Sequence, residues 1–232
     1  MRTCGVLIFS EVATKQVRPW EEDKMKLAIL GATGGIGLEI VRQAVDRNHK
    51  VTVLVRAPER LKPLGDRIEI IQGDPLSSAE LARTIEGQDA VLSGFGPRVP
   101  IAITDANLLY RFGLALTDAM RKVAVRRVVI VSTAFLFKDS IVPPTYLFGR
   151  LFFPGIVADA SEMETIVQKS GLDWTLVRPP RLTDKLRRDR YRVVEGHLPG
   201  FGFTISRADV AAFLIKAAED RTFIQKVVGI SN

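Results

Sequence analysis

Seven residues near the start of the chain have the types and spacing of a phosphate-binding loop. The run Gly31-Ala32-Thr33-Gly34-Gly35-Ile36-Gly37 follows the apolar stretch Leu27–Leu30 and opens a segment with helical spacing of apolar residues. In a strand–turn–helix unit, Gly31 permits the tight turn, Gly34 lets the backbone approach a pyrophosphate, and Gly37 lets the helix pack closely on the strand. The helix N-terminus offers unpaired N–H groups and a partial positive charge to the anion. The pattern therefore predicts a dinucleotide site.

The end of the next apolar stretch indicates which dinucleotide binds. Val51–Val55 has the composition of a strand and is followed by Arg56, with Arg60 and Lys62 close by. An Asp or Glu near this position would accept hydrogen bonds from the ribose hydroxyls of NAD, whereas the 2′-phosphate of NADP calls for a cation. We therefore expect NADP(H) to be preferred over NAD(H). The alternative is that Arg56 is a solvated charge at a strand end.

Further small, polar and cationic residues follow other predicted strands. In parallel sheets, ligands bind beyond the carboxyl ends of the strands, so these residues should gather at one edge. There Asp74 would accept from the adenine amino group, and Gly94-Phe95-Gly96 would let the backbone approach the ribose and pyrophosphate. The other members of this edge are Arg98, Ser132, Thr133, Pro179, Pro180 and Arg181. Each alone is more often a turn residue, but together they predict one site.

The elements that must position these residues alternate between strand and helix. The further predicted strands are Ile68–Ile71, Ala90–Leu92, Arg127–Val131, Trp174–Val177, Tyr191–Val194, Phe203–Ile205 and Lys226–Gly229. The helices predicted after the glycine loop are Ser78–Ile85, Asp105–Lys122, Ser161–Lys169 and a last one that starts at Ser206 in a capping-box pattern. We therefore predict an α/β fold with a doubly wound, mostly parallel Rossmann-type sheet, helices on both faces, and a small C-terminal substrate lobe.

The length and composition of the chain are those of an ordinary globular domain. It has 232 residues, of which 47% are hydrophobic and 25% charged. We expect residues 25–232 to form one NAD(P)-binding domain in which residues 138–160 cover the substrate. Residues 1–24 show no sustained period and lack signal- and transit-peptide features, so we expect a non-essential extension; an added short strand is the alternative. Because no stretch of about 18 apolar residues occurs, we expect no membrane span. The single cysteine suits a reducing compartment, so we expect a cytoplasmic location.

The counts of reactive and charged residues exclude several classes of site. One cysteine and two histidines rule out an intrachain disulfide and a cysteine metal site, and we expect no bound metal. The formal charge of +7 favours anionic partners. Its densest run, Lys185–Arg192, has little aromatic interleaving, so a solvated loop is preferred over a guide for an anionic substrate or a nucleic-acid contact. We expect no nucleic-acid partner.

A set of short motifs scattered over residues 25–232 carries a family resemblance. They are Gly31–Gly37, Val53–Arg56, Gly73-Asp74, Gly87–Val91, Ser132–Leu136, Ser170–Leu172, Pro179-Pro180 and Ser206–Val210. Together they resemble the atypical, NmrA-like short-chain dehydrogenase/reductases that bind NADP(H), closest to the biliverdin-IXβ reductase/flavin reductase branch. The resemblance implies hydride transfer from the nicotinamide to a planar conjugated acceptor, for which a flavin could serve, by a monomer or homodimer.

The resemblance also implies roles for single residues. Thr133 stands where the family places a serine near the reacting ring, with Ser132 beside it, and Pro179-Pro180 looks like the prolines beside the nicotinamide. Arg98 matches a family arginine after the fourth strand. Arg181 stands where the reductase has a histidine, a departure that weakens the transfer of an exact tetrapyrrole activity.

The segment Ile141–Ala158 departs from the family because it is longer than its counterpart. Its aromatic residues, among them Phe148 and Phe152, would cover the coenzyme and bind a flat substrate, unless they pack on the domain or on a second subunit. Tyr146 and Arg150 echo the Tyr-x-x-x-Lys pair of typical short-chain dehydrogenases, which makes Tyr146 a further catalytic candidate. However, Pro143-Pro144 disfavours a helix that starts early enough to carry Tyr146, and arginine does not replace lysine by default.

Three functions are consistent with these residues. The first is an NADP(H)-dependent oxidoreductase that acts on a flavin, tetrapyrrole or quinone-like acceptor, with Ser132 and Thr133 beside the nicotinamide. The second is a non-catalytic NADP(H)-binding redox sensor of NmrA type. The third is an extended-type carbonyl or sugar-nucleotide enzyme, which Tyr146 would have to support.

Overall fold

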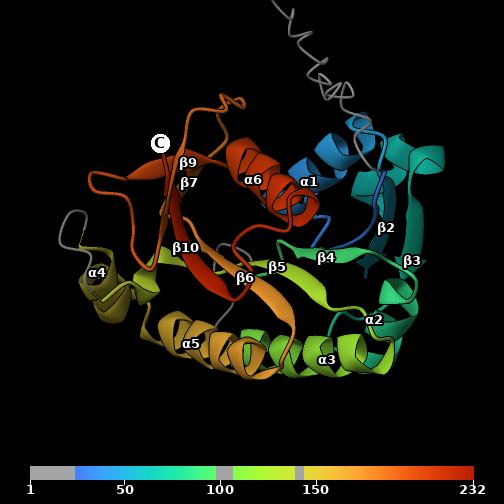
Figure 1. Ribbon diagram of the computed structural model, residues 1–232, viewed down its shortest axis with the longest axis horizontal. Helices are drawn as coiled ribbons and strands as arrows, with labels where there is room; N and C mark the ends of the chain where they lie inside the picture. Colours follow the sequence, from blue (N-terminus) through green and yellow to red (C-terminus); the bar gives the residue numbers. More distant parts are fainter. Residues whose placement is uncertain (1–23, 98–106, 139–143) are drawn as a thin grey trace, which may run out of the picture.

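A sheet of eight strands forms the centre of the computed structural model, which describes residues 24–97, 107–138 and 144–232. Its strands are β1 (Lys26–Leu30), β2 (Lys50–Val55), β3 (Glu69–Gln72), β4 (Ala90–Ser93), β5 (Arg127–Val131), β6 (Asp173–Arg178), β8 (Arg192–Glu195) and β10 (Lys226–Ser231). They lie in the order β3-β2-β1-β4-β5-β6-β10-β8 (Figure 1). Only the pair β10–β8 is antiparallel, which confirms the predicted doubly wound, mostly parallel sheet.

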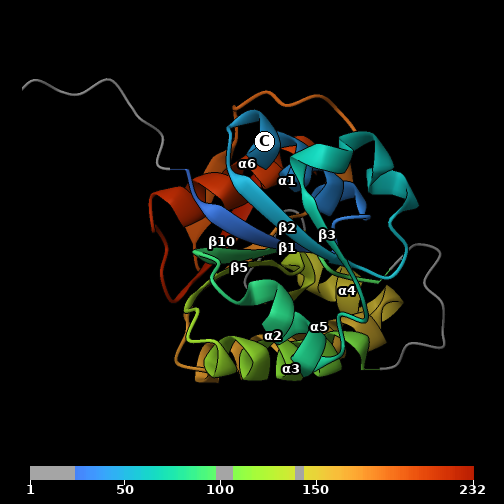
Figure 2. The same ribbon diagram turned by 90° about the vertical axis from the view of Figure 1, so that its right-hand side faces the viewer.

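Helices cover both faces of this sheet (Figures 1 and 2). On one face lie α1 (Gly35–Asp46) and α6 (Arg207–Glu219), and on the other α2 (Ser78–Ile85), α3 (Leu108–Lys122) and α5 (Pro154–Lys169). Successive residues of β1 point to opposite faces, so Leu27 and Ile29 pack under α1 and α6. Ala28 and Leu30 pack against the other layer. Both faces are thus apolar, as expected for a buried parallel sheet.

Two short strands form a separate pair beyond the carboxyl end of β6. These are β7 (Arg181–Thr183) and β9 (Thr204–Ser206), which run parallel to each other. The N-cap of α6 is Ser206, whose hydroxyl accepts from the backbone N–H of Asp209, as the capping pattern predicts. The predictions for Arg98 and residues 1–23 lie outside the described residues, as do the first residues of the helix predicted from Asp105.

The region around residues 144–160 differs from the prediction. The chain forms an additional helix, α4 (Thr145–Phe152), and α5 begins at Pro154, earlier than the predicted start at Ser161. Pro144 is the N-cap of α4 and therefore lies outside the helix, while Pro154 occupies a first-turn position that needs no intrahelical donor. The expectation that Pro143-Pro144 keeps Tyr146 out of a helix is therefore wrong.

Arg127, at the start of β5, is the largest fully buried side chain among the described residues. It is 1% exposed, and its guanidinium donates to the carbonyl oxygens of Asp173, Ala217 and Thr222 and to the Thr175 hydroxyl. Burial lowers the pKa of this guanidinium to about 10, so it remains charged at neutral pH. Arg127 thus joins β5 to β6 and to the end of α6, at the edge opposite the predicted site.

Replacing Arg127 with methionine should destabilise the fold strongly. The change leaves two buried acceptors, the Ala217 carbonyl and the Thr175 hydroxyl, without this donor. At about 1–3 kcal/mol for each, we expect a total loss of roughly 2–6 kcal/mol. Chemical denaturation measures this free energy of unfolding. The control is Arg126→Met, because the neighbouring side chain is 63% exposed and should contribute less than about 1 kcal/mol. Equal losses in the two variants would contradict the assigned role of Arg127.

Candidate functional site

The glycine loop between β1 and α1 is built from close backbone contacts. Gly31 has a φ of +75°, and its carbonyl oxygen accepts from the N–H of Gly34 at 2.9 Å. A Cβ atom on Gly31 would lie 2.7 Å from the backbone nitrogen of Phe95, and one on Gly37 would overlap the carbonyl oxygen of Gly31. The predicted reasons for glycine at Gly31 and Gly37, a tight turn and close helix packing, are confirmed.

The N-terminus of α1 presents backbone donors at this loop. The N-cap residue is Gly34, which supplies no side-chain cap, and the first turn contains no acidic residue. A helix end of this kind carries N–H groups that require an acceptor and a positive partial charge that favours an anion. Binding of a pyrophosphate here remains a prediction, but the local chemistry suits it.

Two arginines stand on one side of the loop. Arg56 follows β2 and is exposed, as its predicted role requires. Arg60, in the 3₁₀ segment Glu59–Arg67, donates to the carbonyl oxygen of Thr33 within the glycine loop at 2.7 Å. The sequence alone shows that these arginines are near each other along the chain. The structure adds that Arg60 reaches the loop itself.

Asp74 and Gly94-Phe95-Gly96 lie at the same sheet edge as the loop. One carboxylate oxygen of Asp74 accepts from the N–H of Leu76, which orients the exposed side chain. Gly94 packs against α1, because a Cβ there would lie 3.0 Å from the nitrogen of Gly37. Phe95 stacks on Phe112 of α3 with ring centroids 4.4 Å apart. Among the described residues, none has an atom within 4 Å of a Cβ added at Gly96.

The ends of β5 and β6 join beyond the regular strands. Ser132 donates its N–H to Val177 at 2.7 Å, and Ala134 donates its N–H to Pro179 at 3.1 Å. These bonds bring Ser132 and Thr133 beside Pro179, as the sheet-edge argument predicts. The Thr133 hydroxyl accepts from the N–H of Phe135 and so stabilises its own turn.

Ser132 differs from Thr133 in one respect that matters for ligand binding. Its Oγ is buried and has no hydrogen-bond partner within the part of the chain that the structure describes. A buried hydroxyl without a partner costs about 1–3 kcal/mol, which a ligand could recover. Ser132 therefore fits a bound nicotinamide or acceptor better than Thr133, which the resemblance places first.

An ion pair that the sequence analysis missed fixes the end of β6. Arg178, which precedes Pro179, donates to both carboxylate oxygens of Glu164 at 3.0 and 2.5 Å. Its guanidinium also lies 4.7 Å from the ring centroid of Phe137. Glu164 is 3% exposed and shares the buried face of α5 with three apolar residues, namely Ala160, Met163 and Val167. In the sequence, the charge of Glu164 on an otherwise apolar helix face is the signal that could have pointed to this ion pair.

The aromatic residues of α4 lie next to this strand end. The Thr145 hydroxyl donates to the carbonyl oxygen of Ala134 at 3.0 Å and anchors the helix there. Phe148 lies 6.1 Å from Phe135 and 4.7 Å from Phe152, measured between ring centroids. Phe148 and Phe152 are 47% and 64% exposed, so they present an apolar surface to solvent. Their contact with a substrate remains a prediction.

The remaining predicted residues, Tyr146 and Arg181, lie on α4 and β7. Tyr146 and Arg150 are one turn apart on α4, with Arg150 Nη1 3.5 Å from the Tyr146 hydroxyl. Arg181 lies on β7 opposite Thr204, with an exposed side chain. Neither position has a described contact with Ser132.

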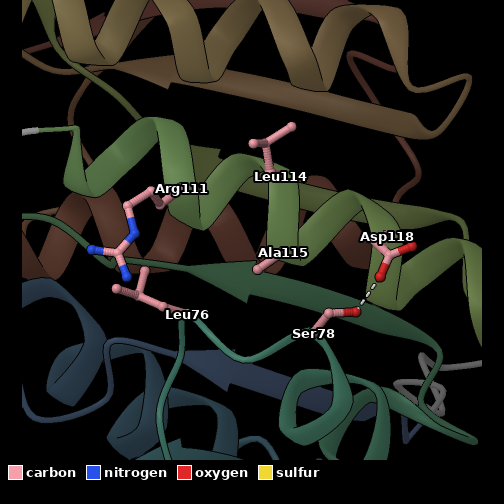
Figure 3. A pocket seen from close by; sticks show the side chains of 6 residues that line it. All are labelled: Leu76, Ser78, Arg111, Leu114, Ala115 and Asp118. Carbon is pink, nitrogen blue, oxygen red and sulfur yellow. Dashed lines mark hydrogen bonds between the residues drawn. The ribbon is translucent and has the colours of Figure 1, made fainter.

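A cavity of about 470 Å³ lies elsewhere, between α2 and α3 (Figure 3). It is lined by Leu76, Ser78, Arg111, Leu114, Ala115 and Asp118. Asp118 accepts hydrogen bonds from Lys122 and Ser78, and these lower the pKa of its carboxyl group. The lining contains none of the predicted site residues, so this cavity is separate from the strand-end site.

Comparison with known protein families identifies the type of site. Residues 31–221 match a family model described as NAD(P)H-binding. The match begins at the first glycine of the loop and continues through α6, so it includes every strand end discussed above. Within the described ranges, the structure contains no helix whose length and apolar character would let it cross a membrane.

Two curated relatives cover about two thirds of the chain. A chloroplastic uncharacterized protein of Arabidopsis thaliana is 32% identical over 66% of this chain and 58% of its own length. The (4-alkanoyl-5-oxo-2,5-dihydrofuran-3-yl)methyl phosphate reductase of Streptomyces griseus is 29% identical over 66% of this chain and 46% of its own length. The chain thus matches about half of each of these relatives.

Solved structures confirm the fold. A short-chain dehydrogenase/reductase from Veillonella parvula in complex with NADP is similar with a TM-score of 0.74, at 18% identity, over 90% of this chain and 94% of its own. The anaerobilin reductase ChuY of Escherichia coli O157:H7 gives a TM-score of 0.73, at 20% identity, over 89% and 96%. At these identities the two structures confirm the predicted Rossmann-type fold, and the family model confirms the predicted NAD(P)H-binding family.

Removing the carboxylate of Glu164 should lower the free energy of unfolding of the protein. Glu164→Ala leaves the charge of Arg178 partly buried and unpaired, which typically costs about 3–5 kcal/mol. Thermal and chemical denaturation would measure the loss. The control is Glu162→Ala, on the exposed face of the same helix, which should change stability by less than about 0.5 kcal/mol. A Glu164 variant as stable as this control would contradict the positioning role of the pair.

Proposed function

Because the chain belongs to the NAD(P)H-binding family, we propose that it is an NADP(H)-dependent reductase that acts on a planar conjugated acceptor. The observation that carries this proposal is the unpartnered, buried Ser132 hydroxyl at a strand end that also holds Pro179. It lies on the same edge as a glycine loop suited to a diphosphate. The donors of this edge therefore fit a dinucleotide whose nicotinamide lies near Ser132.

The charges beside the loop support a preference for NADP(H). Arg56 follows β2, where NAD-specific sites usually place a carboxylate, and Arg60 is anchored to Thr33. Arginine forms bidentate hydrogen bonds with phosphate, so this pair suits the 2′-phosphate. The neutral ribose hydroxyls of NAD would leave both cations without an anionic partner.

The residues of the chain supply position and orientation in this proposal. When bound, the reduced nicotinamide supplies the hydride. The N–H groups at the start of α1 would hold the diphosphate, and the Ser132 hydroxyl would hydrogen-bond the nicotinamide or the acceptor. A conjugated acceptor delocalises the incoming electrons, so its protonation can come from solvent without a dedicated acid. Such a reaction requires few catalytic side chains.

The aromatic surface of α4 supports an apolar, flat acceptor. Phe148 and Phe152 are partly exposed next to the turn that follows Ser132 and Thr133. Aromatic rings of this kind stack on flat conjugated molecules such as flavins, linear tetrapyrroles or quinones. Arg181, which is cationic and exposed beyond the prolines, would pair with acidic groups on such an acceptor. The reductase names of two similar proteins are consistent with this class of reaction.

A carbonyl reductase is the second candidate, because Tyr146 lies in helix α4. Its hydroxyl lies near Arg150 at the spacing that typical short-chain dehydrogenases use for a tyrosine and a lysine. In that chemistry the phenol exchanges a proton with a carbonyl or alcohol. A simple ketone would then be a substrate, and Tyr146 would be indispensable.

The substrate class can be tested by following NADPH absorbance with FMN, biliverdin, a quinone and a simple ketone. We expect turnover with at least one planar acceptor and none with the ketone. Ser132→Ala should lower kcat/KM about tenfold through loss of one hydrogen bond, whereas Tyr146→Phe should leave it unchanged. Ketone turnover that disappears in Tyr146→Phe would support the second candidate. Tight NADPH binding without any turnover would indicate a redox sensor instead.

The coenzyme preference can be tested with Arg56→Asp. This variant should bind NADPH roughly 10- to 100-fold more weakly, because hydrogen bonds to charged groups contribute about 1.5–3 kcal/mol. NADH affinity should be preserved. Isothermal titration calorimetry with both coenzymes measures the ratio, and Lys50→Asp, at the opposite end of β2, controls for the change of charge. Equal losses for NADPH and NADH would contradict selectivity through Arg56.

A further inference from the structure

Arg207 packs against the glycine loop at Gly35, whereas Arg60 contacts the loop at Thr33. It is the first residue of α6, which lies beside α1 in both ribbon views (Figures 1 and 2). A Cβ atom added to Gly35 would lie 2.6 Å from Cδ and 2.7 Å from Nε of Arg207. The three nearest atoms around that position all belong to Arg207. The side chain therefore crosses the first residue of α1 at van der Waals distance.

The absence of a side chain at Gly35 leaves room for this contact. Gly35 is the first helical residue and does not have a positive φ, so the backbone itself would accept alanine there. An alanine would, however, require the flexible end of Arg207 to move, because its Cβ atom would occupy the space that the arginine now fills. Glycine at position 35 therefore lets the guanidinium lie close to the start of α1.

The charge of Arg207 has a partner that is easily exchanged. Its Nη1 lies 2.5 Å from a carboxylate oxygen of Asp184, whose side chain is 90% exposed. Exposed ion pairs contribute little to stability, so the guanidinium can leave Asp184 for a stronger anion at small cost. A diphosphate at the N-terminus of α1 would be such an anion, because arginine binds phosphate oxygens in a bidentate manner.

The backbone around Arg207 is held firmly. Asp209, which is fully buried, accepts from the hydroxyl of Ser206 and from the N–H groups of Arg188 and Asp189. Gln43 of α1 donates to the carbonyl oxygen of Ala208 at 2.9 Å. These bonds fix the start of α6 relative to α1, so Arg207 is presented to the loop from a rigid base.

On the basis of the coenzyme site proposed above, we propose that Arg207 binds the diphosphate of the dinucleotide. Two groups of cations then divide the coenzyme between them. Arg56 and Arg60, of which Arg60 contacts Thr33, bind the 2′-phosphate, and Arg207, which lies beside Gly35, binds the diphosphate. Arg207 would therefore set the affinity for both NADPH and NADH, whereas Arg56 sets the choice between them.

The division of roles can be tested by calorimetry with three ligands. NADPH carries both the diphosphate and the 2′-phosphate, ADP-ribose carries the diphosphate without the 2′-phosphate, and adenosine 2′-monophosphate carries the 2′-phosphate without the diphosphate. Arg207→Met keeps the aliphatic stem over Gly35 and removes the charge. It should weaken NADPH and ADP-ribose binding about tenfold and leave adenosine 2′-monophosphate binding unchanged. Arg56→Asp should show the converse pattern, with ADP-ribose unaffected.

A second variant separates ligand binding from a merely structural role. Asp184→Asn removes the competing carboxylate while Arg207 stays in place, and it should strengthen NADPH and ADP-ribose binding about threefold. If Arg207 only braced α6 against α1, both variants would lower the melting temperature and weaken all three ligands alike. That result would overturn the inference, as would unchanged affinities in Arg207→Met.

The controls distinguish this inference from the proposed function. If the wild-type protein binds NADPH and responds to Arg56→Asp, but Arg207→Met has no effect, only the role of Arg207 is lost. If the wild-type protein binds neither NADPH nor ADP-ribose, the coenzyme site itself is refuted, and the inference with it.

Discussion

The architecture of the candidate site depends on the backbone contacts between the loop after β1 and the segment after β4. A methyl group on Gly31, Gly37 or Gly94 would bring non-bonded atoms to within about 3 Å of it or closer, which the packing cannot accept. These contacts hold the N-terminus of α1 at the carboxyl edge of the sheet, where β1 pairs with β2 and β4. The helix end that we propose to bind the diphosphate is thereby placed between the arginines after β2 and the strand ends that lead to Ser132.

A second set of bonds connects this loop to the region where chemistry would occur. The backbone pairs Ser132–Val177 and Ala134–Pro179 continue the β5–β6 pairing after both strands have ended. Arg178 is held by Glu164 from the other layer of the fold, so the prolines cannot move independently of α5. The edge that would receive the nicotinamide is thus tied to the core on both sides. This rigidity favours a site that orients reactants over one that must close around them.

The sequence predicted the parts of the molecule that follow from local pattern. Continuous apolar runs such as Val128–Val131 indicate a sheet buried on both faces, and the glycine spacing indicates the turn and the start of α1. It failed where tertiary contacts decide. Pro143-Pro144 disfavoured a helix that carries Tyr146, yet α4 forms because Pro144 lies just outside it and Thr145 bonds to Ala134. The role of Thr133 stays a prediction; the structure adds that its hydroxyl stabilises its own turn, while that of Ser132 has no partner among the described residues.

Glu164 and Arg207 show why a part of the candidate site could not be predicted from the sequence pattern alone. Each is an ordinary charged residue in a helix, and each acquires its role from a partner far away in the sequence, Arg178 or Gly35. For Arg207 the relation works in both directions. The arginine fits because position 35 lacks a side chain, and glycine is tolerable at position 35 because the start of a helix loses less by it than the middle does. A positive charge can therefore lie directly against the start of α1, where we propose that the diphosphate binds, and neither residue would reveal this by itself.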